Sequence, residues 1–132
     1  MDALAVVLET PEQLALRALD LAPAGPADAI VAVSWSGIST GTERLLWSGR
    51  MPSFPGMGYP LVPGYESVGT VVEAGPDCGV AVGQTGVVPG ARCFGDGDGL
   101  FGGAAAHLVG PAARLVPGDA GIGDKACPIA PA

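Results

Sequence analysis

Basic residues are scarce in this 132-residue chain. It has one lysine and five arginines against 13 acidic residues, for a formal net charge of −7. Because nucleic-acid binding needs clustered lysine and arginine opposite the phosphates, this balance argues against a nucleic-acid partner. Charged residues of both signs make up 14% of the chain, well below the roughly 25% of an average soluble domain.

Long apolar runs are also missing. The longest, residues 3–8, is far shorter than the roughly 20 residues that a membrane-spanning helix needs, so we expect no transmembrane segment. The first residues carry no basic segment typical of a secretory signal. Cysteine is limited to Cys78, Cys93 and Cys127, an odd number at wide spacings. We interpret them as reduced thiols of a cytoplasmic protein.

Residues able to bind metal or to act as nucleophiles are equally few. The single histidine, His107, has no cysteine at a spacing typical of a zinc site. There is no G-x-S-x-G motif of a serine hydrolase. Residues 97–102 match G-x-G-x-x-G, but a strand-like segment follows them, and Asp96 and Asp98 would repel phosphate. We interpret this segment as a glycine-rich loop and His107 as a strand residue.

Glycine, proline and apolar residues are abundant. The chain has 22 glycines and 13 prolines, and 48% of its residues are hydrophobic. Its mean hydropathy of +0.43 is too high for a disordered chain. Short apolar strands joined by turns, in a mainly β fold of one domain, are therefore predicted. The expected strands are 3–8, 13–19, 29–35, 65–74, 86–88, 92–94, 104–109 and 114–116.

One short helix is expected among these strands. Thr40 and Glu43 fit the S/T-x-x-E capping box shortly before the three apolar residues 45–47, and Gly49 follows as a stop signal. Four prolines make residues 51–64 a loop.

Two segments carry the pattern of a known family. They are SGISTGTE at 36–43 and PLVPGYESVGTVVEAG at 60–75, and PAARLVP at 111–117 follows in order. Together they resemble the GroES-like catalytic domain of the medium-chain dehydrogenase/reductase superfamily, over nearly the whole chain. The resemblance implies a partly open β-barrel with one or two short helices over residues 1–117. Residues 118–132 would be an aberrant or truncated tail where the family's Rossmann domain is absent.

Residues 40–65 are similar, more specifically, to the dehydrogenases of bacteriochlorophyll synthesis that oxidise the ring-A hydroxyethyl group of bacteriochlorophyllide a to acetyl. This resemblance implies a chlorin (bacteriochlorophyllide) substrate and NAD as cofactor. Because the family holds the dinucleotide in its other domain, we expect no cofactor-binding residue here and no turnover by this chain alone. The oligomeric state stays open.

The resemblance also implies a member without zinc. Where zinc-dependent relatives have a ligand cysteine and a ligand histidine, this chain has Ser39 (or Thr40) and Tyr65, which are poor zinc ligands. The hydroxyls of Ser39, Thr40, Thr42 and Tyr65 are then the candidate proton acceptors, with Glu66 as a further catalytic candidate. A purely structural role is open for each.

Glu43 and Glu66 match acids that lie behind the metal in zinc-dependent relatives. Without a metal, they are expected to accept hydrogen bonds from the backbone or to pair with an arginine such as Arg44 or Arg92.

An aromatic and methionine-containing segment is the candidate substrate surface. Aromatic rings and thioethers can stack on a large flat macrocycle. The alternative is a loop that only covers the end of the barrel. The candidate substrate-binding residues are Trp47, Met51, Phe54, Met57 and Tyr59.

Two other functions are compatible with the sequence. One is a non-catalytic GroES-like barrel that binds a pigment or a partner protein. The other is a fragment of a zinc-free quinone or enone reductase of the same superfamily.

Overall fold

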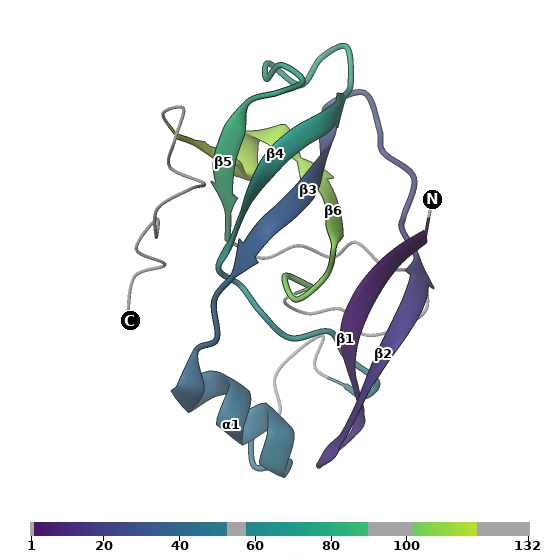
Figure 1. The fold of residues 1–132 in the computed structure, drawn as a ribbon, viewed down its shortest axis with the longest axis vertical. Helices are drawn as coiled ribbons and strands as arrows, with labels where there is room; N and C mark the ends of the chain where they lie inside the picture. Colours follow the sequence, from purple (N-terminus) through teal and green to yellow (C-terminus); the bar gives the residue numbers. More distant parts are fainter. Residues whose placement is uncertain (1, 53–57, 90–101, 119–132) are drawn as a thin grey trace.

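The computed structural model describes residues 2–52, 58–89 and 102–118, and its strands form two antiparallel sheets (Figure 1). One sheet pairs β1 with β2, and the other has five strands in the order β6-β3-β4-β5-β7. The strands are β1 Asp2–Thr10, β2 Gln13–Asp20, β3 Asp28–Ser36, β4 Ser67–Ala74, β5 Thr85–Val88, β6 His107–Pro111 and β7 Val116–Pro117. The helices are α1 Thr40–Ser48 and the 3-10 helix Ala112–Arg114.

The mainly β architecture with one short α-helix confirms the fold class predicted from the sequence. Three expected strand bounds were wrong. β4 begins at Ser67, because Tyr65 and Glu66 before it contact the start of α1 and the loop that precedes it. β6 begins at His107. The expected strand at 114–116 is instead the end of the 3-10 helix Ala112–Arg114, and the strand is limited to Val116 and Pro117, which pair with β5. The expected strand at 92–94 lies outside the described residues.

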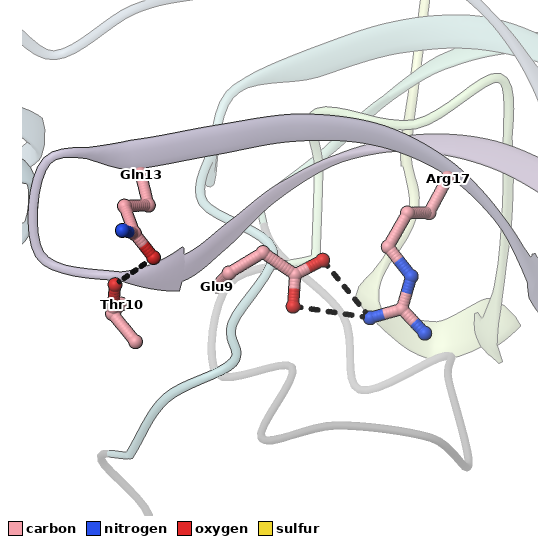
Figure 2. Close-up of polar contacts among 4 residues, drawn as sticks. All are labelled: Glu9, Thr10, Gln13 and Arg17. Atoms are coloured by element: carbon pink, nitrogen blue, oxygen red, sulfur yellow. Dashed lines mark hydrogen bonds and ion pairs between the residues drawn. The ribbon is translucent and has the colours of Figure 1, made fainter.

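β1 and β2 form a hairpin with one buried face. Ala3, Ala5 and Val7 are buried, whereas Leu4 between them is 54% exposed, which is the two-residue period of a strand. At the outer side of the hairpin, Arg17 forms an ion pair of 3.1 Å with Glu9 (Figure 2). Near the turn, the Thr10 hydroxyl donates to the side-chain oxygen of Gln13 at 2.7 Å (Figure 2).

β1 connects the two sheets. The N–H of Val6 donates to the carbonyl of Ala104 at 2.9 Å, and the N–H of Ala106 donates to Leu4 at 2.8 Å. Further along β1, Leu8 and Leu61 exchange two backbone hydrogen bonds of 2.8 and 3.0 Å. The main core fills the space between the sheets, and its largest members are Val7, Leu19, Leu21, Ile30, Val31, Val62, Val71, Val88, Leu108, Val109 and Leu115.

A second, smaller core lies under α1. It consists of the buried residues Leu8, Leu46 and Leu61, with Met51 and Tyr59 packed against it. The helix lies at one end of the molecule, opposite the connection between β4 and β5 (Figure 1). Within the described ranges, no helix has the length and apolar character needed to cross a bilayer.

Candidate active site

The N-terminus of α1 differs from the predicted capping box. Ser39, not Thr40, is the N-cap, and Thr40 is the first helical residue. The Ser39 side chain makes no capping hydrogen bond, whereas its backbone N–H donates to a carboxylate oxygen of Glu43. The expectation that Glu43 accepts a backbone hydrogen bond is confirmed.

The connection that carries Tyr65 and Glu66 is fixed by close backbone contacts with the segment before β6. The N–H of Gly103 donates to the carbonyl of Gly64 at 2.8 Å, and the N–H of Ala104 donates to Pro63 at 2.9 Å. Gly64 has φ 95°, and a Cβ there would lie 2.8 Å from the Ala104 nitrogen. Only glycine fits this backbone, so the position of the following residue is well defined.

Thr42 and Tyr65 are brought together across the two elements. The Thr42 hydroxyl on the first turn of α1 lies 3.4 Å from the Tyr65 phenol oxygen, and both side chains are half-buried. Either hydroxyl can donate or accept. At this distance the contact is looser than an ordinary O–H···O bond of about 2.7–2.8 Å, as is common at sites that tighten when a substrate binds.

Glu43 and Glu66 are also neighbours at this site. Burial of the Glu43 carboxyl raises its pKa above the ordinary value of 4.5; the hydrogen bond from Ser39 N–H opposes this effect, and the nearby Glu66 charge adds to it. The backbone of Glu66 is tied to the loop before α1, since its carbonyl accepts the Gly37 N–H at 2.6 Å. Among the described residues the ion pair is Arg17–Glu9, so Arg44 pairs with neither Glu43 nor Glu66; Arg92, the other arginine considered as a partner, lies outside the described residues.

The remaining catalytic candidates are placed differently. Ser39 is half-buried at the start of α1, and Thr40 is exposed. Neither side chain takes part in the Thr42–Tyr65 contact or in the bond between the Ser39 N–H and Glu43. The structure therefore joins Thr42 with Tyr65 and Glu43 with Glu66, and leaves Ser39 and Thr40 beside these pairs.

The candidate substrate surface is partly described. Trp47 is on α1 and is 40% exposed. Met51 and Tyr59 pack against the smaller core, and the Tyr59 hydroxyl donates to the carbonyl of Leu46 at 2.5 Å. Phe54 and Met57 lie outside the described residues.

Comparison with known proteins identifies the family. Residues 25–120 match the family described as the alcohol dehydrogenase GroES-like domain. The chain belongs to this family. The match covers the five-stranded sheet, α1 and both residue pairs of the site, so the GroES-like domain implied by the sequence is confirmed.

Two curated relatives of this GroES-like domain have the same name. The 2-desacetyl-2-hydroxyethyl bacteriochlorophyllide A dehydrogenase of Rhodobacter capsulatus is 48% identical over 131 residues, which are 98% of this chain and 42% of the relative. The protein of that name from Cereibacter sphaeroides is 51% identical over 121 residues, covering 88% of this chain and 38% of the relative. The chain thus spans about two fifths of the length of the curated relatives it matches.

Solved structures support the same architecture. A thermostable alcohol dehydrogenase from Pyrobaculum aerophilum is similar with a TM-score of 0.70 and 26% identity, over 91% of this chain and 42% of that one. A putative zinc-binding dehydrogenase from Sinorhizobium meliloti, bound to NADP, has a TM-score of 0.69 and 25% identity, over 91% of this chain and 39% of that one.

The described residues of this GroES-like domain are not suited to bind zinc or a dinucleotide. Zinc favours imidazole and thiolate ligands, but the side chains gathered here are hydroxyls and two carboxylates. Among residues 2–52, 58–89 and 102–118, no group of three or more His, Cys, Asp or Glu could hold a metal ion. Their strand pairs are all antiparallel, whereas a dinucleotide site of the Rossmann type needs parallel strands joined by a helix.

Sequence reasoning missed two contacts that shape the site. Buried Ser67 donates its hydroxyl to the carbonyl of Gly103 at 2.9 Å, and Tyr59 donates to Leu46. The serine contact joins residues 36 positions apart, so no local signal in the sequence could reveal it. A glycine pair at 102–103 was visible, but its tight approach to Gly64 depends on tertiary packing.

Proposed function

We propose that this GroES-like domain is the substrate-binding part of an NAD-dependent dehydrogenase that oxidises the hydroxyethyl group of a bacteriochlorophyllide to acetyl. The names of the two relatives, at 48% and 51% identity, support this substrate class. The contact between Thr42 and Tyr65 supports the reaction type, because it places two proton-accepting and proton-donating groups at one point.

Oxidation of the hydroxyethyl group to a ketone removes a hydride from carbon and a proton from oxygen. The role proposed for this domain is to accept the proton. In our proposal the substrate hydroxyl lies against the Thr42 and Tyr65 oxygens, which accept its hydrogen bond and pass the proton towards water. The hydride acceptor, proposed to be NAD, is not held by the described residues.

Zinc has no role in this proposal. In zinc-dependent enzymes the metal holds and polarises the alcohol oxygen. Here the two hydroxyl groups would hold that oxygen by hydrogen bonds. Glu43 and Glu66 are neighbours at the same site, and burial raises the pKa of the Glu43 carboxyl.

Trp47 is the residue we propose for contact with the macrocycle. Its indole is 40% exposed on α1, the helix that also carries Thr42. Met51 and the ring of Tyr59 pack beside the same helix end and extend this apolar area. A flat chlorin lying on this surface could direct its hydroxyethyl group towards Tyr65.

A pigment titration tests the substrate class. Hydroxyethyl bacteriochlorophyllide is added to the 132-residue chain, and the pigment absorbance bands are followed. We expect a saturable spectral shift that Trp47→Ala weakens about tenfold, in line with the loss of a stacked aromatic contact.

Val82→Ala is the matched control for this titration. Val82 is 64% exposed, and it lies on the connection between β4 and β5, at the end of the molecule opposite α1 (Figure 1). This variant should bind the pigment like the parent chain. An equal loss of affinity in both variants would indicate nonspecific adsorption of pigment and would contradict the proposal.

A further inference from the structure

The last turn of α1 is held by groups from two other parts of the chain. The Tyr59 hydroxyl donates to the carbonyl of Leu46 at 2.5 Å. The backbone N–H of Glu12, in the turn between β1 and β2, donates to the carbonyl of Trp47 at 2.7 Å. Carbonyls at a helix C-terminus lack the usual N–H partner of the next helical turn. The Leu46 carbonyl accepts the Gly49 N–H at a longer 3.3 Å, so the Tyr59 hydroxyl is the shorter of its two bonds.

The turn between β1 and β2 is shaped to reach this helix end. Glu12 has φ 64°, a left-handed conformation that is unfavourable for a residue with a Cβ. Such a conformation persists where the surroundings hold it. Next to it, Pro11 lies so close to Gly49 that a Cβ on the glycine would be 2.8 Å from the proline Cγ. The turn therefore fits tightly onto the end of α1.

The same helix carries both groups that the proposed function uses. Thr42 lies in its first turn, and Trp47 lies in its last turn. Leu46, between them, is fully buried against Leu8 and Leu61. A short helix held at its C-terminal end by two outside donors moves as one body, so a change at that end alters the positions of both groups.

We propose that Tyr59 is a positioning residue. Its hydroxyl, together with the N–H of Glu12, fixes the last turn of α1 and so sets the places of Thr42 and Trp47. The consequence for substrate binding rests on the proposed function, whereas the positioning of α1 does not depend on it. Tyr59 contributes to the site through its hydroxyl as well as through its ring.

Tyr59→Phe separates these two contributions, because it keeps the ring and removes the hydroxyl. The variant is made in a Trp35→Phe background, in which Trp47 is the sole tryptophan of a chain that has two. We expect acrylamide to quench Trp47 fluorescence more strongly in the variant. We also expect the dissociation constant of hydroxyethyl bacteriochlorophyllide to rise about fivefold, the effect of losing one hydrogen bond.

Val82→Ala in the same Trp35→Phe background is the control. Val82 is 64% exposed on the connection between β4 and β5, at the end of the molecule opposite α1 (Figure 1). This variant should show the quenching and the pigment affinity of the Trp35→Phe parent. Both measurements are made well below the melting temperature of each variant, so that only folded protein is compared.

Three results are decisive. A lower melting temperature for Tyr59→Phe with unchanged quenching and unchanged pigment affinity would overturn the proposal, since the hydroxyl would then be only a local stabiliser. Stronger quenching with weaker pigment binding would support it. If the parent chain binds no pigment, the proposed function fails. The quenching comparison then decides the positioning role alone: an increase supports it, and no change overturns it.

Discussion

The Thr42 hydroxyl lies 3.4 Å from the phenol of Tyr65, and this contact joins the first turn of α1 to the connection that leads into β4. Hydrogen bonds fix the backbone near both residues. The helix start is tied to Glu43 through the Ser39 N–H, and the residue before Tyr65 is tied to Gly103. Two hydroxyls therefore meet at a position that the fold itself determines.

Tyr65→Phe tests whether the phenol binds the substrate oxygen. The variant should lower the affinity for hydroxyethyl bacteriochlorophyllide about fivefold, because it removes one hydrogen bond to that oxygen. The vinyl analogue, which lacks the oxygen, should bind both proteins equally. Titrations of both pigments into both proteins give this comparison. An equal loss for the two pigments would mean that Tyr65 supports the surface without contacting the oxygen.

The raised pKa of Glu43 predicts a pH dependence of stability. The folded state holds this proton more tightly than the unfolded chain, so between the ordinary value of 4.5 and the raised value the unfolded chain releases its proton first. This carboxyl thus lowers the free energy of unfolding as pH rises through that window. Glu43→Gln should remove the decline while keeping an acceptor for Ser39 N–H.

Urea unfolding at pH 4 and pH 7 measures this effect. Relative to the parent chain, Glu43→Gln should be more stable at pH 7 than at pH 4. Glu66→Gln removes the neighbouring charge that contributes to the raised pKa of Glu43. It should therefore also reduce the fall in stability between pH 4 and pH 7, but by less than Glu43→Gln does. A parent-to-variant difference that is the same at both pH values contradicts the account.

Gly49 and Gly79 offer a matched pair of substitutions. Both have φ 75°, but an added Cβ meets open space at Gly79 and lies 2.8 Å from the Pro11 Cγ at Gly49. Gly79→Ala should therefore cost about 1 kcal/mol from backbone strain alone. Gly49→Ala should cost about 1–3 kcal/mol more, from the clash with the hairpin turn. Denaturant midpoints measure both, and equal costs would mean that the turn does not rest on α1.

Ser67 and Ser36 donate to the same carbonyl and differ in burial. The Ser67 hydroxyl is fully buried and lies 2.9 Å from the Gly103 oxygen, whereas exposed Ser36 lies 3.2 Å from it. Ser67→Ala should lower the free energy of unfolding by about 1 kcal/mol, and Ser36→Ala by less than about 0.5 kcal/mol. Chemical denaturation checks the order, and a larger cost for Ser36→Ala would be inconsistent with it.

Local patterns in the sequence were sufficient for most of the fold. Alternation of buried and exposed residues in β1, and glycine at the end of α1, are properties of neighbouring residues. The bounds of β4 and β6 were missed because strand ends depend on the partner strand. The capping residue was misplaced by one position, since the helix start is set by where the chain leaves β3.

Less of the candidate site was predictable. Thr42 and Tyr65 were both candidates, yet their contact spans 23 positions and follows from the packing of α1 against residues 61–66. The proximity of Glu43 and Glu66 arises in the same way. A backbone hydrogen bond or an arginine partner had been expected for each, and Glu43 has the backbone bond. Tyr59 was predicted as a substrate contact from its aromatic character, whereas its bond to Leu46 depends on tertiary structure.

The zinc content of the purified chain tests most directly whether hydroxyl groups, rather than a metal, hold the substrate oxygen. The chain is purified without added metal, dialysed against a chelator and analysed for zinc and protein in the same sample. Our account predicts no stoichiometric zinc, because Ser39 and Tyr65 provide neither thiolate nor imidazole. Stoichiometric zinc that survives the chelator would contradict it.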